Sequence, residues 1–257
     1  MSRNETVRLE RLEGGQIWRL WLATPKANIL DMDKVERLSA LFSQAASEQN
    51  LKAILIEGEG PHFSFGASVE EHLPGKVDAM IPGFHQLFER LFDAGVPTLA
   101  AVGGQCLGGA LELASLCNRV FAHPGAMLGQ PEIVLGVFAP VASVALPERI
   151  GRSRAEDLCL SGRSIGAEEA LRIGLVDAID DEPGMAALTY AREYLVPHSA
   201  SSLRLAQRAL RDGYRKRFKQ ELRSVERLYL DGLMSTKDAH EGLSAFMEKR
   251  KPAWRNQ

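Results

Sequence analysis

The sequence predicts an α/β fold that is followed by a purely helical region. Up to about residue 184, short apolar runs alternate with helical patterns, which is typical of strands that alternate with helices. Beyond Glu182-Pro-Gly184, four helical stretches follow one another with no convincing strand among them. We therefore expect an α/β core over residues 1–184 and an α-helical subdomain over residues 185–257.

Individual elements follow from local patterns. Two runs with strand propensity, 7–13 and 16–22, flank Gly14-Gly15 and predict a β-hairpin. Asp31 is the expected N-cap of a helix over about residues 33–49. The remaining patterns predict strands at 52–57, 96–102, 118–122 and 175–179, an extended segment at 127–134, and helices at 84–92, 110–116, 140–150, 153–160, 167–173, 185–195, 199–212, 215–230 and 238–250.

Composition excludes several classes of protein. A hydrophobic share of 45% and a net charge of −2 are ordinary for a globular protein and give no argument for nucleic-acid or membrane binding. The three cysteines have no CxxC spacing, which favours reduced thiols. The first residues are charged, and no apolar run approaches the roughly 20 residues that span a bilayer. We therefore expect a cytoplasmic protein with no membrane partner.

The stretch from Val102 to Cys117 joins a glycine-rich turn to an apolar helix. The N–H groups of the first helical turn lack intrahelical partners and can face a developing negative charge. Glu112 falls in that turn, and Glu132 falls in the following extended segment, both among apolar residues. Two acids near one donor group indicate acid/base chemistry on an anionic intermediate. For Glu112 alone, a structural hydrogen bond or a helix-dipole role fits the spacing equally well.

Other motifs fail on inspection. The glycines match neither G-x-G-x-x-G nor a P-loop, and no G-x-S-x-G elbow offers a serine nucleophile. The six histidines show no metal-binding spacing, so no metal is expected. The basic tract from Arg204 to Arg227 is typical of a solvated face. Anchoring of a ligand phosphate or a neighbouring subunit is an alternative, and nucleic-acid binding is not expected.

Three motifs carry a family resemblance: Phe63-Ser-Phe-Gly-Ala-Ser-Val69, Gly104-Gln-Cys-Leu-Gly-Gly-Ala-Leu-Glu112 and Gly129-Gln-Pro-Glu-Ile-Val-Leu-Gly136. In order and spacing they resemble the signature of the crotonase (enoyl-CoA hydratase/isomerase) superfamily, and the similarity runs over nearly the whole chain. The resemblance implies a crotonase-like ββα spiral core with an acyl-CoA site. It also implies a homotrimer or a dimer of trimers held by the C-terminal helices, and no cofactor other than the CoA of the substrate.

The resemblance also implies roles for individual residues. The N–H groups of Ala67 and Gly109 form an oxyanion hole for the thioester carbonyl, and Glu112 and Glu132 act on water and on carbon. Because many members keep fewer acids, the presence of both favours hydration over thioester hydrolysis or dehalogenation. Residues that match substrate or CoA contacts are Lys26, Ala27, Phe65, Phe138, Phe246 and Lys249.

Two departures from the family pattern indicate a remodelled pocket. Ser68 stands where Asp is frequent, and residues 136–143 replace a glycine-rich turn. Phe65, Phe138 and Pro140 either line this pocket or simply pack. The motifs are most similar to hydratases of cyclic dienoyl-CoA thioesters in anaerobic benzoyl-CoA degradation. A short-chain enoyl-CoA hydratase, an enoyl-CoA isomerase and a non-enzymatic RNA-binding member remain alternatives.

Overall fold

The computed structural model describes residues 5–24 and 26–257 and contains two β-sheets. The larger sheet has the strand order β1-β2-β3-β4-β6-β9, with β1 antiparallel to β2 and the other pairs parallel. A smaller sheet consists of β5, β7 and β8; β5 precedes the helix of Glu112, and β7 precedes the segment of Glu132. The strands are β1 (Val7–Leu12), β2 (Ile17–Leu22), β3 (Ala53–Gly58), β4 (Thr98–Val102), β5 (Gln105–Leu107), β6 (Arg119–Ala122), β7 (Met127–Gly129), β8 (Ser164–Gly166) and β9 (Ala178–Ile179).

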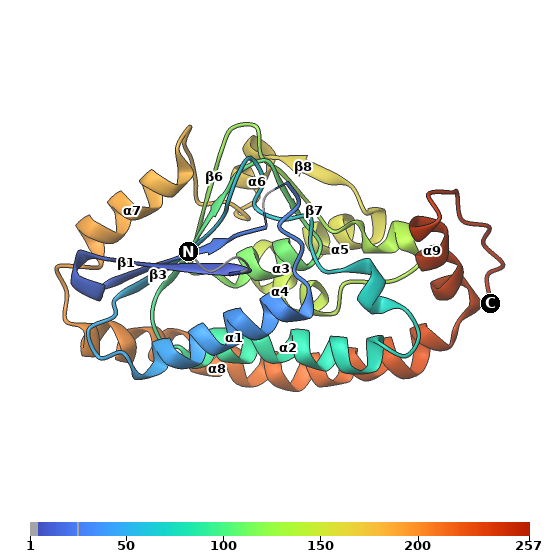
Figure 1. The fold of residues 1–257 in the computed structure, drawn as a ribbon, viewed down its shortest axis with the longest axis horizontal. Helices are drawn as coiled ribbons and strands as arrows, with labels where there is room; N and C mark the ends of the chain where they lie inside the picture. Colours follow the sequence, from blue (N-terminus) through green and yellow to red (C-terminus); the bar gives the residue numbers. More distant parts are fainter. Residues whose placement is uncertain (1–4, 25) are drawn as a thin grey trace.

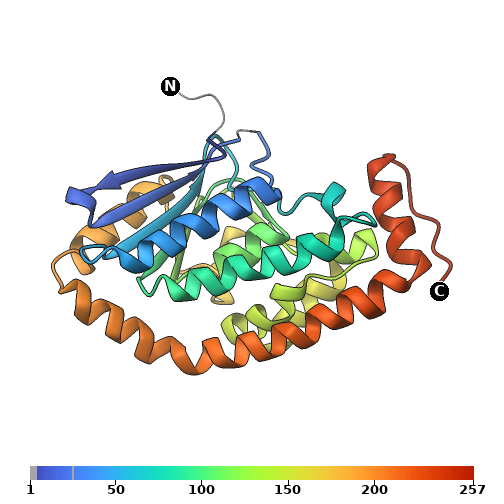
Figure 2. The same cartoon turned by 60° about the horizontal axis from the view of Figure 1, so that its bottom comes forward.

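Helices cover both faces of the larger sheet. The α-helices are α1 (Met32–Ser47), α2 (Val77–Asp93), α3 (Gly109–Leu116), α4 (Pro140–Ile150), α5 (Arg152–Ser161), α6 (Ala167–Arg172), α7 (Pro183–Tyr194), α8 (Ala200–Arg227) and α9 (Lys237–Met247). Figures 1 and 2 show α1 and α2 side by side, with α8 running along the length of the molecule below them. On the other face, α7 packs against β3, β4 and β6.

The central strands are apolar on both faces because helices cover both faces. All five residues of β4 and the first four of β3 are buried, and among these nine only Thr98 is polar. A continuous apolar run of this kind is typical of parallel strands inside an α/β core. The predicted strands at 52–57 and 96–102 therefore match β3 and β4. The α/β fold and the helical C-terminal region are confirmed, whereas the division of the chain at residue 184 stays a prediction.

The predictions for the first hairpin and for the start of α1 are confirmed. The predicted hairpin is present, with Val7 opposite Leu22 and Leu12 opposite Ile17. The Asp31 side chain accepts a hydrogen bond from Lys34 N and caps α1 as expected.

The extended segment predicted at 127–134 is wrong in its second half. The strand β7 ends at Gly129, and residues 131–135 form a 3-10 helix. Pro131 occupies the first turn of that helix, where its fixed φ and missing N–H are tolerated. This early turn moves Glu132 from a strand to a helical turn.

The helices predicted at 199–212 and 215–230 are in fact one, because α8 runs unbroken through Gly213 and continues as a π-helical turn over Leu228–Gly232. Tertiary packing compensates for the low helix propensity of Gly213. The ring of the adjacent Tyr214 packs against Phe92 of α2 and against Phe218 of its own helix. An interior glycine costs only about 1 kcal/mol, and these two aromatic pairs, at about 0.5–1.5 kcal/mol each, offset that cost.

The basic tract on α8 is used inside the fold. Arg204 donates to the carbonyl oxygens of Ala45, Glu48 and Ala94, which end α1 and follow α2, and Arg211 donates to Leu116 O at the end of α3. Four further basic residues of α8 pair with acidic side chains: Arg215 with Asp93, Lys216 with Asp212, Arg217 with Glu148 and Lys219 with Glu89. These contacts involve six of the nine basic residues between Arg204 and Arg227, and none of the six needs an external anion.

Candidate active site

Two loops distant in sequence are hydrogen-bonded side by side at the carboxyl end of β4. Ser64 N donates to Gln105 O at 3.0 Å, and Leu107 N donates to Ser64 O at 3.1 Å. The buried Ser64 hydroxyl then accepts from Gly66 N at 3.0 Å and fixes the turn that follows. This pairing brings the segment ending at Ala67 against the first turn of α3.

The N–H groups of Ala67 and Gly109 lie close together and are free. Ala67 N stands 3.3 Å from the position that a Cβ of residue 109 would occupy. Gly109 is the first residue of α3 and so has no intrahelical acceptor for its N–H. Within residues 5–24 and 26–257, neither N–H donates to a protein acceptor. Both residues line the same cavity, so together they form a donor pair suited to a carbonyl oxygen that becomes negative.

Glu112 lies one turn into α3 and is buried, with 3% exposure. Its Oε1 accepts a hydrogen bond of 2.7 Å from Ala142 N in the first turn of α4. Burial raises the pKa of this carboxyl, and the hydrogen bonds from Ala142 and Val141 only partly oppose that rise. The Ala142 bond fixes one carboxylate oxygen.

Glu132 lies near Glu112, on the 3-10 helix that follows β7 of the smaller sheet. Parallel pairing of β5 and β7 places the start of α3 and the 3-10 helix of Glu132 next to each other, with Gly108 N donating to Gly129 O at 2.9 Å. Burial raises the pKa of Glu132, and the negative charge of Glu112 raises it further. Two carboxyl groups coupled in this way favour a state in which one holds a proton and the other is ionised.

Gln130 is a buried residue that the sequence reasoning missed as a partner of Glu132. With its side-chain amide nitrogen turned toward the carboxylate, Gln130 donates to Glu132 Oε1 and Oε2 at 3.2 and 3.0 Å. The only signal was its position inside Gly129-Gln-Pro-Glu132. This contact orients the carboxyl group of Glu132.

The cavity in front of these groups is mostly apolar. Its free volume of about 80 Å³ has room for several water molecules, since one needs roughly 10–15 Å³. The polar groups in the wall are the two glutamates and two histidines that the sequence analysis did not single out, His72 and His85. The apolar lining comes mainly from the loop after β3, from α2, from residues 135–140 and from Leu243 of α9: Phe65, Val69, Met80, Ile81, Phe84, Leu135, Val137, Phe138, Pro140 and Leu243.

The predicted substrate-contact residues fall into two groups. Phe65 and Phe138 line the cavity, and Ala27 O accepts from Phe65 N at 2.9 Å, so Ala27 lies at its edge. Lys26 is exposed in the same turn, with a φ of +99°. Phe246 and Lys249, near the end of α9, are exposed and outside the cavity wall. CoA contacts at these positions stay a prediction.

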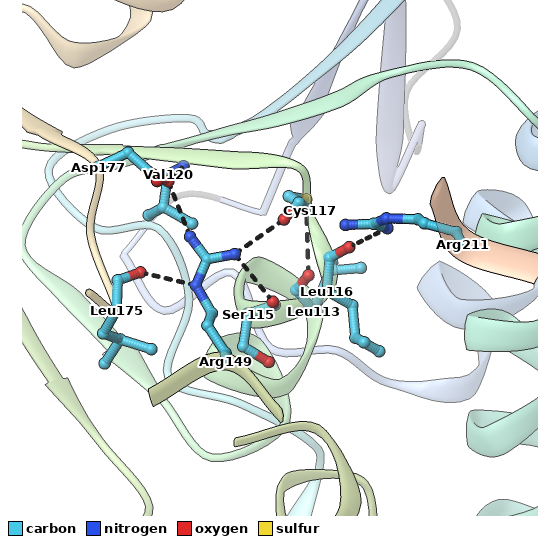
Figure 3. Close-up of polar contacts among 9 residues, drawn as sticks. All are labelled: Leu113, Ser115, Leu116, Cys117, Val120, Arg149, Leu175, Asp177 and Arg211. Carbon is cyan, nitrogen blue, oxygen red and sulfur yellow. Dashed lines mark hydrogen bonds and ion pairs between the residues drawn. The ribbon is translucent and has the colours of Figure 1, made fainter. Parts of the chain in front are cut away.

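The far end of α3 is clamped by two arginines (Figure 3). Arg149 of α4 donates to Ser115 O at 3.2 Å and to Cys117 O at 2.9 Å, and it pairs with Asp177 at 2.8 Å. Arg211 of α8 donates to Leu116 O at 2.7 Å. These cations satisfy the last carbonyl groups of the helix and complement its dipole. They therefore fix the helix whose opposite end carries Gly109 and Glu112.

Among the described residues, no group of three His, Cys, Asp or Glu side chains could hold a metal ion. Within the same residues, no helix is long and apolar enough to cross a membrane.

A two-sheet α/β core that directs paired main-chain donors, the buried carboxyl group of Glu112 and the half-buried one of Glu132 at one apolar cavity defines an enzyme of the crotonase class. The family model for enoyl-CoA hydratase/isomerase matches residues 13–257, and the chain belongs to that family.

Individual relatives cover almost the whole chain. It is 50% identical over 250 residues to a cyclohexa-1,5-dienecarbonyl-CoA hydratase of Thauera aromatica, covering 97% of this chain and 96% of that protein. It is 34% identical over 254 residues to a probable enoyl-CoA hydratase of Mycobacterium bovis, covering 96% and 97%. The crystal structure of an enoyl-CoA hydratase/isomerase from Pseudoalteromonas atlantica shares the fold with a TM-score of 0.87 at 22% identity, covering 97% of this chain and 100% of that one.

Proposed function

We propose that the chain adds water to cyclohexa-1,5-diene-1-carbonyl-CoA and forms 6-hydroxycyclohex-1-ene-1-carbonyl-CoA. The observation that carries this proposal is the pair of carboxyl groups of Glu112 and Glu132, both with raised pKa values, in one cavity with the N–H groups of Ala67 and Gly109. The 50% identity to a hydratase of that name supports the choice of acyl group.

In the proposed reaction, the thioester oxygen binds between Ala67 N and Gly109 N. Glu112, in its ionised form, takes a proton from water as the water oxygen bonds to the β-carbon of the dienoyl group. The electrons move into a dienolate, and the two N–H groups stabilise its oxygen. Glu132 then gives its proton to the vinylogous carbon on the far side of the ring.

The proton balance closes within the pair of glutamates. One proton leaves water for Glu112, and one leaves Glu132 for carbon, so the product gains the elements of one water molecule. Transfer of a proton from Glu112 to Glu132 restores the starting state, and their electrostatic coupling favours a shared proton. If Glu132 takes the proton from water and Glu112 gives its proton to carbon, the protons balance in the same way. No resident cofactor is needed for these steps.

The second candidate is a short-chain enoyl-CoA hydratase. Relatives at 34% identity carry the name probable enoyl-CoA hydratase, which favours this alternative over an isomerase. The RNA-binding alternative is weakened because six of the nine basic side chains between Arg204 and Arg227 already have carbonyl or carboxylate partners.

One experiment separates these candidates. The purified chain is given the cyclic dienoyl-CoA and crotonyl-CoA in competition, and the products are analysed by mass spectrometry. We expect the hydroxylated cyclic thioester to form with the larger kcat/KM. Preferential hydration of crotonyl-CoA would favour the short-chain enzyme, and RNA binding without hydration would overturn both enzymatic assignments.

Assembly and location are part of the same proposal. The C-terminal helices expose several large apolar residues, which supports contact with further copies of the chain in a trimer or a dimer of trimers: Leu205, Leu210, Leu228, Phe246 and Met247. Cys106, Cys117 and Cys159 are all free, which supports a reducing, cytoplasmic compartment.

A further inference from the structure

His85 is an unusual member of the cavity wall because one of its ring nitrogens has no partner. The residue lies on α2 between the buried Phe84 and Leu87, and it is only 4% exposed. Its Nδ1 is 2.6 Å from Oε2 of Glu226 on α8. Glu226 is not one of the residues that line the cavity. Its Nε2 is fully buried and makes no hydrogen bond among the described residues.

The contact with Glu226 determines what Nε2 can do. Burial lowers the pKa of His85, which favours the neutral ring. In the neutral ring, the proton sits on Nδ1 and is donated to the Glu226 carboxylate, so Nε2 carries a lone pair. His85 is one of the residues that line the cavity, and Nε2 is on the ring edge opposite Nδ1. Nε2 is therefore a buried acceptor without a protein partner in the described part of the chain, on a residue of the cavity wall.

A second buried polar atom without a partner lies close to the same wall. The hydroxyl of Tyr229, three residues after Glu226, has no hydrogen bond within residues 5–24 and 26–257. Its ring packs on Phe138 at 5.2 Å and on His72 at 6.4 Å between centroids, and both of those residues line the cavity. Buried polar groups are rarely left unpaired in native proteins. Two such groups here indicate that this side of the cavity receives a polar ligand atom.

The proposed reaction leaves one such atom without an assigned partner. Glu112 accepts one hydrogen of the water, and Glu132 serves the far carbon, so the second O–H of the water needs another acceptor. We propose, on the basis of the proposed function, that His85 Nε2 accepts the hydrogen bond of this O–H, first from water and then from the product hydroxyl. His85 is thus a specificity residue for a hydroxylated acyl group.

The test measures the contribution of the hydroxyl to binding. In a Glu132→Gln background, which is too slow to consume the ligands, affinities are measured by calorimetry for 6-hydroxycyclohex-1-ene-1-carbonyl-CoA and for cyclohex-1-ene-1-carbonyl-CoA, which lacks only the hydroxyl. Adding His85→Phe is expected to weaken the hydroxylated ligand about tenfold, or about 1.4 kcal/mol, and to leave the other ligand within about twofold.

Three further variants make the result decisive. His123→Phe, at an exposed histidine outside the cavity wall, is the matched control and should change neither affinity. Glu226→Met frees the His85 tautomer and should give a smaller loss for the hydroxylated ligand only, which tests the proposal even if His85→Phe does not fold. The proposal would be overturned if His72→Phe, and not His85→Phe, weakened binding of the hydroxylated ligand alone. It would also be overturned if His85→Phe weakened binding of both ligands equally.

Failure of the proposed function is distinguishable from failure of this inference. If the parent chain does not hydrate the cyclic diene, the assignment of substrate falls. The same comparison with 3-hydroxybutyryl-CoA and butyryl-CoA then still reports whether Nε2 of His85 accepts from the hydroxyl.

Discussion

Glu132 lies so close to Gly108 that a Cβ at residue 108 would stand 2.5 Å from Glu132 Oε1. Gly108 also has a φ of +53° and a ψ of −128°, a conformation that is essentially limited to glycine. Because residue 108 has no side chain, the carboxyl group of Glu132 can lie directly against the backbone at the start of α3.

Gly108→Ala should disrupt the site through both effects. We expect a loss of about 1–3 kcal/mol in unfolding free energy from the strained backbone, measured by urea denaturation, and a loss of activity beyond that because Glu132 is displaced. Gly213→Ala is the control, since its added methyl group meets only Arg217 Nη1 at 3.8 Å in the middle of α8. Equal activity of the two variants would show that residue 108 does not position Glu132.

Glu112→Gln and Glu132→Gln should each lower kcat by about 100- to 10,000-fold, the usual contribution of a general acid or base. Binding of the substrate thioester should persist, because neither change removes the N–H groups of Ala67 and Gly109. Steady-state hydration kinetics and calorimetric titration with a saturated thioester give the two quantities. A variant that keeps near-normal turnover removes that glutamate from the mechanism.

The pH dependence of kcat/KM should be bell-shaped, because the reaction needs one ionised and one protonated carboxyl group. Both limbs should lie above the ordinary carboxyl range, since burial raises the pKa values of both groups. The limbs belong to the coupled pair and not to either residue alone. A profile that is flat between pH 5 and pH 9 would contradict a shared proton.

Glu112→Gln should also stabilise the protein at alkaline pH. The folded-state pKa of Glu112 is raised, so between its ordinary value of 4.5 and the raised value the folded state binds more protons than the unfolded state. Stability therefore falls as pH rises through that window, by about 1.4 kcal/mol for each unit of pKa difference. Glutamine cannot ionise and escapes this loss.

Urea denaturation at pH 5 and pH 9 measures that effect. The stability of the variant relative to the parent chain should be greater at pH 9 than at pH 5. Glu193→Gln, at an exposed position on α7, should show no such difference. A relative stability of Glu112→Gln that is independent of pH would mean that Glu112 does not pay a burial cost when ionised.

Arg149→Met should destabilise the chain by on the order of 3 kcal/mol, because it leaves carbonyl groups at the end of α3 and the Asp177 carboxylate without their charged donor. Arg152→Met, at an exposed residue at the start of α5, is the control. Chemical denaturation compares the two. Similar midpoints would show that the clamp on α3 adds little to stability.

Local signals predicted those parts of the fold that local interactions decide. The Asp31 cap and the hairpin depend on neighbouring residues and were placed within a few positions. The break expected near Gly213 does not exist, because distant aromatic contacts hold α8 together. The strands β5 and β8 have three residues each and were missed, since so short a run has no periodicity.

The same distinction applies to the site. Their apolar surroundings pointed to Glu112 and Glu132, and the family resemblance implied Ala67 and Gly109; the structure brings all four to one cavity. His85 was missed because its neighbours on the apolar face of α2 suggest a core position, and its partner Glu226 lies 141 residues away. Contacts of that kind leave no trace in a local pattern.

The contacts of Arg204 and Arg211 on α8 affect the order in which the chain can fold during synthesis. Arg204 and Arg211 supply the donors for carbonyl groups at the ends of α1, α2 and α3, yet they emerge from the ribosome after about four-fifths of the chain. Ala45 O and Glu48 O also accept from backbone N–H groups nearby in the sequence, whereas Ala94 O and Leu116 O depend on these arginines or on water until α8 is in place. The contacts that complete the ends of α1, α2 and α3 therefore form only after α8 has been made, so the native packing of these helices is completed late in synthesis.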